Sequence, residues 1–475
     1  MTRSFFAITR LNNENIQELE RSLQGQFENH FNPEEIEKLA KTNKFVQRSS
    51  KLNGCTFLSL ILFNSNSLHE QSLNDLTIAL NKKHGIDISK QGLDDRFNEY
   101  AVQFLKGALE NLLQQQLVEK ISFRNCEEFR RILIKDSVCF QIDESLAEYY
   151  PGSGGSGSKA NVRIQFEYDF LSGHIVDLSL NAFNEQDAKD SVLTLDVIHN
   201  GDLIVRDLAY MHLEALQGIV EKIADFLCRL NTQAKVYQEQ DGTMIELDFP
   251  AIVKAMRKYN ILQTEEMVFI GKNQELEVRL FIYLLPEAAY LERMRKANNT
   301  AKSKGRQLSK KFKARNALNL FITSAPEELI SIETAWKIYT LRWQIELTFK
   351  VWKSLCKIDK VKKVKKDRLE CYIWSKLLLI VLCWQVAWFT GMLLRRHYGK
   401  NLSYFKAFKT LMHDVIALEK IFIHSTLAAE LYLVEFLILS SKKHLLEKKK
   451  GCENYSPEVL FRSLTILENG NLVAI

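Results

Sequence analysis

Four side chains suited to phosphate and metal chemistry recur at fixed spacing in one stretch of the sequence. The gaps between Tyr339, Arg342, Glu346 and Lys353 are two, three and six residues. At about 100° per residue, a helix would carry all four within a sector of about 60° on one face. A carboxylate that lies among cations on such a face suits a metal ligand that works beside a polyanion.

The stretch that carries these residues contains neither Pro nor Gly, so residues 331–357 are predicted to form one continuous helix. Ser331 can cap its start. Ile345, Phe349 and Trp352 lie beside the charged face and can anchor the helix to a core. The alternative interpretation is a solvated surface helix whose charges form i, i+4 pairs.

The length and charge of the chain set broad limits on its function. A chain of 475 residues is too long for one hydrophobic core, so two or three domains are expected. Its 46% hydrophobic and 26% charged residues are typical of a folded protein. The net charge of +6 is a mild excess, so any interaction with nucleic acid must depend on where the basic residues lie.

Cysteine and histidine spacing gives no sign of disulfides or zinc. The eight cysteines are scattered without a Cys-x-x-Cys pair, and the ten histidines show no ligand spacing near them. A reducing cytoplasm is therefore expected. The first ten residues have too short an apolar run for a signal peptide.

One apolar segment is long enough to raise the question of a membrane. Residues 377–394 contain no charge and are flanked by Lys376 and two arginines. Length alone would admit a membrane span, but a fully buried helix against a central sheet has the same composition. The core helix is the preferred interpretation, and no membrane partner is expected.

The N-terminal part of the chain is predicted to be helical. Within residues 72–97, one helix ends at Gly85 and Ser89 can cap a second. This is the pattern of a helix-turn-helix, with Lys90, Gln91 and Arg96 near the start of a possible recognition helix. Plain helix packing is the alternative, and a glycine within the second helix slightly disfavours the DNA-binding interpretation.

The middle of the chain alternates strands and helices. Residues 131–142 are predicted to form a strand with an acid, Asp136, in its middle. A Gly- and Ser-rich loop follows; it lacks the Lys-Ser/Thr of a P-loop, which excludes an NTPase. The next predicted elements are an amphipathic antiparallel hairpin (162–170 and 175–180), a helix (187–197), a strand (202–207), a helix (210–224) and a strand (225–230). This is the order of a ribonuclease-H-like domain, in which carboxylates at the ends of neighbouring strands converge on metal ions.

A strongly basic run follows. Residues from about 231 to 316 have a mixed pattern that suggests a β-rich insertion. Its last part, 293–315, holds ten Lys or Arg and no acid. Such a one-sided run favours phosphate contact and could be disordered without DNA. Within it, Arg306, Lys310 and Lys311 are expected to bind DNA.

The spacing Tyr-x2-Arg-x3-Glu-x6-Lys resembles the signature of the insertion-sequence-four family of bacterial DDE transposases. Residues 72–105 resemble the N-terminal region of the subgroup found in Bacillus-type bacteria. By this resemblance Glu346 is the third acid of a catalytic, metal-binding triad. Tyr339, Arg342 and Lys353 would then contact phosphates or the terminal bases of the element end.

The resemblance also assigns the other two acids. Asp136 stands in Asp-Ser-Val, where the family has threonine in place of Val138. Asp207 stands in Gly-Asp-Leu-x-x-x-Asp-x-Ala-Tyr, where the family has glycine in place of Ala209. The alanine leads us to expect an altered or strained turn there. Asp143, which also follows an apolar run, remains the rival of Asp136.

These assignments imply a cofactor and a reaction. Two Mg²⁺ ions held by the three carboxylates are expected, and Mn²⁺ can substitute for them. The protein would bind the terminal inverted repeats of its element, cut at the ends and join the freed 3′-hydroxyls to target DNA. A synaptic homodimer in the bacterial cytoplasm, associated with the nucleoid, is also implied. The alternative is a catalytically decayed or recruited copy that only binds DNA. Val138 and Ala209 suggest this alternative because they depart from the family pattern beside two of the acids.

The expected architecture is α/β with three parts. Residues 1–125 form a helical DNA-binding domain. Residues 126–400 form a ribonuclease-H-like catalytic domain with the β-rich insertion at about 231–316. Residues 401–475 form a helical C-terminal region.

Overall fold

The computed structural model describes most of the chain. The described residues are 32–48, 50–115, 128–153, 159–185, 187–230, 234–415, 418–419 and 426–446. The helical pattern expected before residue 32, the Gly- and Ser-rich run 154–158 and the tail after residue 446 lie outside them.

One sheet of ten strands runs through the described part of the chain, in the order β3-β2-β1-β4-β5-β10-β9-β8-β6-β7. The strands are β1 (Arg131–Gln141), β2 (Asn161–Asp169), β3 (Ile175–Ala182), β4 (Asp202–Arg206), β5 (Asp225–Arg229), β6 (Val236–Gln240), β7 (Thr243–Glu246), β8 (Gln263–Ile270), β9 (Leu276–Leu284) and β10 (Leu318–Thr323). The pairs β1·β4 and β4·β5 are parallel, and the other pairs are antiparallel. The succession of strands and helices that was predicted along residues 131–230 is confirmed. Both β5 and β10 complete the central sheet.

The antiparallel hairpin β2–β3 forms as predicted, but its polar face is not solvated. Every residue of β2 is buried, including Arg163, Gln165 and Glu167. Glu167 pairs with Lys135 of β1 and Arg206 of β4, so charge pairing replaces water on that face. The amphipathic antiparallel hairpin is thus confirmed, and its polar face is buried because charged residues that are distant in sequence pair with it.

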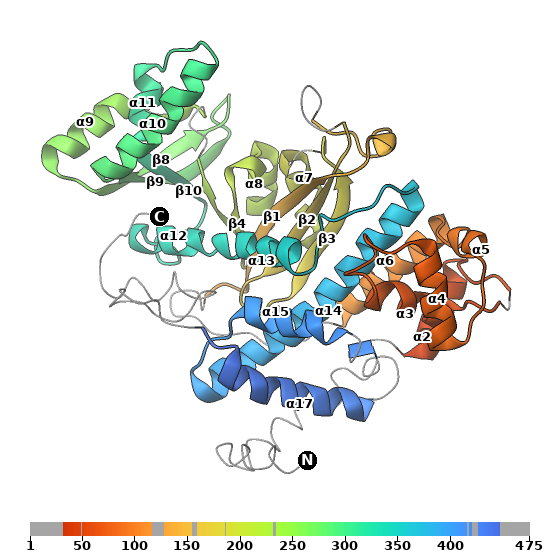
Figure 1. Cartoon of the computed structure of the whole chain (residues 1–475). Helices are drawn as coiled ribbons and strands as arrows, with labels where there is room; N and C mark the ends of the chain where they lie inside the picture. Colours follow the sequence, from red (N-terminus) through yellow and green to blue (C-terminus); the bar gives the residue numbers. More distant parts are fainter. Residues whose placement is uncertain are drawn as a thin grey trace.

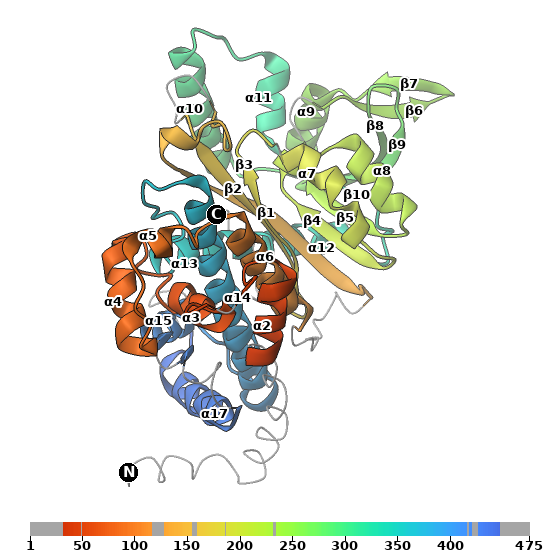
Figure 2. The same cartoon turned by 90° about the vertical axis from the view of Figure 1, so that its right-hand side faces the viewer.

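The apolar segment forms the core helix α14 (Lys366–Tyr398), which runs between the sheet and the N-terminal helices (Figures 1 and 2). Among the described helices it alone is long and apolar enough to cross a membrane, and 94% of its apolar window is buried inside the protein. The rings of Trp384 and Trp388 pack on Tyr168 of β2, with centroids 5.2 and 6.3 Å apart. The Trp384 indole N–H donates to the carbonyl of Gly173 in the β2–β3 turn. The core-helix interpretation is confirmed.

The N-terminal helices pack against the opposite side of α14 (Figure 2). They are α2 (Pro33–Thr42), α3 (Gly54–Phe63), α4 (Leu73–His84), α5 (Lys90–Asp94) and α6 (Glu99–Gln114). The predicted end of α4 at Gly85, with φ +65°, and the predicted cap of α5 by Ser89 are both present. The described C-terminal helices α15 (Tyr404–His413) and α17 (Thr426–Lys443) lie beside α14 as well.

The insertion between β5 and β10 contains helices as well as strands. Its strands β6 to β9 extend the central sheet, and α9 (Phe249–Tyr259), α10 (Glu287–Ser303) and α11 (Lys310–Asn316) gather beside them (Figure 1). The predicted β-rich pattern is thus only part of an α/β segment. The basic run forms α10 and α11, with Arg315 buried over the ring of Phe249.

The predicted continuous helix over 331–357 is interrupted. The structure has α12 (Ile332–Thr340) and α13 (Trp343–Ser354), with a tight turn between them. At this turn the N–H of Leu341 donates to the carbonyl of Ile338, and the N–H of Arg342 to that of Tyr339, over 3.0 and 3.1 Å. These i to i−3 bonds tighten the chain, as in a 3₁₀ turn. Ser331 lies at the start of α12, but its hydroxyl contacts Thr334 and caps no N–H.

Candidate active site

Two of the predicted acids are placed by neighbouring parallel strands, Asp136 within β1 and Asp207 directly after β4. Lys135 of β1 pairs with Arg206 of β4, so the following residues, Asp136 and Asp207, lie side by side where β4 ends. The carboxylate of Asp136 accepts a hydrogen bond from the N–H of Ser137 at 2.8 Å. The parallel register thus brings together acids that are 71 positions apart in the sequence.

Helix α13 adds the third acid, Glu346, while α12 and the turn between the two helices add two partners of the acids, Tyr339 and Arg342. The Tyr339 hydroxyl donates to Asp207 at 3.0 Å. The Arg342 guanidinium donates through Nη1 to Asp136 at 3.3 Å and through Nη2 to Glu346 at 2.7 Å. All three carboxylates line one cavity of about 320 Å³. The structure therefore brings together Asp136, Asp207 and Glu346 as predicted, with Arg342 between two of them.

Cations rim the same cavity. Lys353 and Lys350 line it, and the Lys353 ammonium lies 3.5 Å from the carbonyl of Cys139. The Lys350 ammonium lies 5.7 Å from the ring centre of Trp343, a half-exposed side chain. Neither Lys350 nor Trp343 was predicted as a site residue, although Lys350 follows Glu346 by one helical turn and could have been found from that spacing.

The electrostatics of the site follow from burial and crowded charge. Burial raises the pKa of Asp136 to about 6, and the nearby carboxylates of Asp207 and Glu346 add to the rise. Burial would lower the pKa of the Arg342 guanidinium, but the charge of Asp207 and the bond to Glu346 raise it above its ordinary value. Burial and the charge of Asp207 raise the pKa of the Tyr339 hydroxyl, which therefore stays protonated as a donor.

The donor chemistry of the site fits a hard divalent cation. Carboxylate oxygens are the ligands that Mg²⁺ and Mn²⁺ prefer. Within the described residues, however, no three Asp, Glu, His or Cys side chains converge on a single metal position. The oxygens of Asp136 and Glu346 are turned instead toward the guanidinium of Arg342.

Neither departure from the family pattern disturbs the site. Val138 is buried and lines the cavity wall. Ala209 lies in a short 3₁₀ turn (208–210) and does not have a positive φ, so the expected strain is absent. The next residue, Tyr210, donates to Gln165 of β2 at 2.6 Å and fixes the turn. The rival acid Asp143 instead accepts from the N–H of Ser145, outside the cavity.

The other predicted DNA contacts lie on separate surfaces. Arg306 and Lys310 are exposed at the junction of α10 and α11, and Lys311 pairs with Glu246. Lys90 and Gln91 are exposed on α5. This helix has five residues, which is short for a recognition helix.

Arg96 is held inside the N-terminal helices. Its guanidinium donates to the carbonyls of Phe45 and Leu52 and to the hydroxyl of Ser50. It also lies 5.4 Å from the ring centre of Phe45. A contact between Arg96 and DNA would have to replace these bonds, which makes it the weakest of the predicted DNA contacts.

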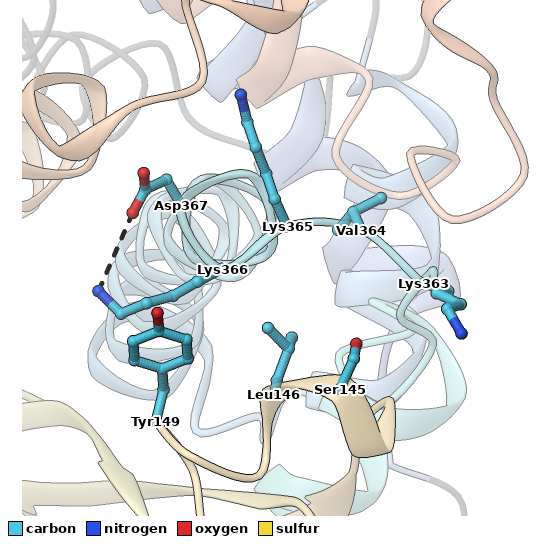
Figure 3. Close-up of a pocket in the computed structure, with 8 residues that line it drawn as sticks. All are labelled: Ser145, Leu146, Tyr149, Lys363, Val364, Lys365, Lys366 and Asp367. Atoms are coloured by element: carbon cyan, nitrogen blue, oxygen red, sulfur yellow. Dashed lines mark ion pairs between the residues drawn. The ribbon is translucent and has the colours of Figure 1, made fainter.

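A second, larger pocket of about 710 Å³ lies at the start of α14 (Figure 3). It is lined by Ser145, Leu146, Tyr149, Lys363, Val364, Lys365, Lys366 and Asp367. The Lys366 ammonium lies over the ring of Tyr149, and Lys365 donates to the carbonyl of Asp94 at 2.8 Å. The lysine-rich segment before α14 therefore contacts α5 directly.

Comparison with known proteins agrees with this fold and site. The family described as "Transposase DDE domain" matches residues 127–382, more than half of the chain. The chain therefore belongs to the DDE transposase family. It is 33% identical over 454 residues to the transposase for insertion sequence element IS231F of Bacillus thuringiensis subsp. israelensis, covering 92% of this chain and 95% of that relative.

Two further relatives are also transposases for insertion sequence elements. The chain is 33% identical over 401 residues to the transposase for insertion sequence element IS231B of Bacillus thuringiensis subsp. berliner, covering 81% of this chain and 84% of that relative. It is 27% identical over 400 residues to the transposase for insertion sequence element IS1151 of Clostridium perfringens, covering 80% and 84%. These relatives confirm the resemblance to the Bacillus-type subgroup.

Proposed function

We propose that this chain is the DNA transposase of an insertion sequence and that Asp136, Asp207 and Glu346 form its catalytic centre. The observation that carries the proposal is the meeting of these three acids, from three elements, in one cavity rimmed by Lys350 and Lys353. The order β3-β2-β1-β4-β5 supports a ribonuclease-H-like assignment for the catalytic domain. The family and the relatives support strand cleavage and strand transfer at the element's terminal inverted repeats.

The three carboxylates would hold two Mg²⁺ ions, or Mn²⁺ in their place. Two such ions activate the attacking oxygen and stabilise the leaving oxygen of a phosphodiester. The residues of the chain supply the rest. Tyr339 positions Asp207 through its hydroxyl, while Lys353 and Lys350 attract the DNA backbone to the cavity. Water and then a 3′-hydroxyl serve as nucleophiles, so no covalent protein intermediate is needed.

DNA contacts outside the cavity would come from three surfaces. We assign them to Arg306 and Lys310 on α10–α11, to the lysines beside the pocket of Figure 3, and to Lys90 and Gln91 on α5. Because residues 365 and 94 are in contact, α5 and the catalytic part can face the same DNA. In this proposal residues 1–125 bind DNA and residues 126–400 catalyse. In the C-terminal region 401–475, the described helices α15 and α17 support α14. Two copies would pair the element ends at the bacterial nucleoid.

Excision of the element in bacterial cells tests the proposed function. A plasmid carrying the element's two ends around a marker should lose the marker when the wild-type chain is expressed. Asp207→Asn should abolish excision, since it removes a ligand charge. Asp196→Asn, an exposed acid in a neighbouring turn, is the matched control and should excise normally. Excision by the Asp207 variant at the wild-type rate would exclude this catalytic centre.

A further inference from the structure

The guanidinium of Arg342 lies between two of the three acids. One terminal nitrogen donates to Asp136 and the other to Glu346. The side chain is only 14% exposed, and its centre lies 5.8 Å from the ring of Tyr339. Within the described residues its Nε has no hydrogen-bond partner, so these two carboxylates are its main polar contacts.

Arg342 partly neutralises the negative charge of the carboxylates in the cavity. Three carboxylates in one cavity repel one another, and each is more stable beside a cation. Among the described residues, Arg342 is the cation ion-paired with Asp136 and with Glu346. Lys350 and Lys353 line the same cavity but form no ion pair with either acid. Arg342 therefore links Asp136 to Glu346, while Asp207 is bonded to the Tyr339 hydroxyl.

We propose that Arg342 acts as a gate for metal binding. Its guanidinium occupies the carboxylates of Asp136 and Glu346 until a DNA phosphate binds the guanidinium and releases them. This inference rests on the proposed function for the presence of metal and DNA. A divalent cation needs the same oxygens, and it would be repelled by a guanidinium at this distance. The DNA backbone offers Arg342 a better partner, because a phosphate accepts two parallel hydrogen bonds from one guanidinium.

Such a gate couples metal binding to DNA binding. When Arg342 moves to a phosphate, the two carboxylates become available to the cation. By thermodynamic linkage, DNA must then raise the affinity for metal by the same factor as metal raises the affinity for DNA. The benefit to a nuclease is that the centre is loaded only where DNA is already in place.

The test is Mn²⁺ binding to the DNA-free full chain, measured by electron paramagnetic resonance. Arg342→Ala should bind Mn²⁺ at least about tenfold more tightly than the wild type, because the cation no longer competes with the charge-assisted bonds that Arg342 makes to Asp136 and Glu346. Lys350→Ala removes a cation from the same cavity without removing an ion pair to these acids, and its affinity should change less than about twofold. Equal affinities for the wild type and Arg342→Ala would overturn the gate.

The coupling is measured with a duplex of the element's own end that lacks a 3′-hydroxyl and cannot react. At saturating DNA, the wild type should gain Mn²⁺ affinity, and Arg342→Ala should gain clearly less. If removal of the charge prevents folding, Arg342→Lys serves instead, because a lysine cannot bridge both carboxylates and should give an intermediate affinity. A gain that is equal in the wild type and the variants would also overturn the gate.

The proposed metal centre and the proposed gate can fail separately. If the wild type binds Mn²⁺ in the presence of DNA and Glu346→Gln does not, the proposed metal centre stands. The comparison of the wild type with Arg342→Ala then decides whether Arg342 is a gate. If the wild type binds no Mn²⁺ with or without DNA, the metal centre fails and the gate fails with it. Metal binding, and not activity, is the readout throughout.

Discussion

At the scale of single residues, the centre is defined by the conflict between burial and charge at Asp136. Its carboxylate is held between the N–H of Ser137 and the guanidinium of Arg342. These bonds do not fully offset burial, because the pKa of Asp136 still rises to about 6. Without metal, ionised Asp136 therefore lowers the free energy of unfolding, and a bound cation would offset this loss.

This conflict predicts a pH-dependent effect of Asp136→Asn on stability in EDTA. A carboxyl with a raised pKa in the folded state destabilises the fold above that pKa, and the penalty disappears as the pH falls toward its unfolded value, 3.8. We expect the variant to be about 1–2 kcal/mol more stable than the wild type at pH 7.5 and no more stable at pH 4. Urea unfolding at both pH values measures this.

Asp143→Asn is the control of opposite sign. The hydroxyl and N–H of Ser145 lower the pKa of Asp143, so its charged form is favoured by the fold. Its replacement should not stabilise the chain at pH 7.5. A stabilising effect of both substitutions, or of neither, would contradict the electrostatic account of Asp136.

At the scale of elements, local sequence patterns predicted the helices and strands that depend on residue spacing, but not the features that depend on tertiary contacts. The strand with Asp136, the strand ending before Asp207 and the core helix α14 follow from runs of apolar residues and from their spacing. The break between α12 and α13 could not be predicted, since helix propensity is uniform there and the turn forms around the contacts of Arg342. The buried charges of β2 were also missed, because their partners come from other strands.

The turn between β2 and β3 gives an element-scale prediction with a matched control. Gly173 has φ +72°, and a Cβ there would lie 2.2 Å from the ring of Trp388 on α14. Gly173→Ala should cost about 3–5 kcal/mol, from the left-handed backbone and the clash together. Gly242→Ala shares the strain at φ +77° but has open space around it, so it should cost only about 1–2 kcal/mol. Equal losses in thermal or urea unfolding would mean that the α14 contact carries no stability.

At the scale of the whole molecule, the N-terminal helices and the catalytic part are joined by α14. The ring of Phe97 packs on Tyr372, and Gln385 donates to the carbonyl of Leu112. The sequence predicted a helical N-terminal segment and an α/β centre, but not that the insertion extends the same sheet. Strand order across such distances depends on pairing between segments far apart in sequence, which local patterns do not encode.

The contact of Asp94 with α14 and its preceding segment predicts how DNA binding depends on this arrangement. Asp94 of α5 accepts from Lys365 and Arg368, which fixes α5 beside the lysine-lined pocket. Asp94→Arg should repel both cations and weaken binding to the element end several-fold, with less than about 1 kcal/mol lost in stability. Asp87→Arg adds the same charge at an exposed position just before α5 and should not weaken binding. Fluorescence anisotropy with a labelled duplex compares them, and equal affinities would show that α5 does not act with the catalytic part.

The most direct test of the central claim is cleavage of a labelled DNA fragment that carries the element's end, with Mg²⁺ or with EDTA. We predict cuts at the repeat boundary by the wild type that require Mg²⁺ and vanish in Glu346→Gln. Glu333→Gln, an exposed acid on the preceding helix, should cut like the wild type. Cleavage by Glu346→Gln at the wild-type rate, or bound but uncut DNA with every protein, would contradict a three-carboxylate catalytic centre.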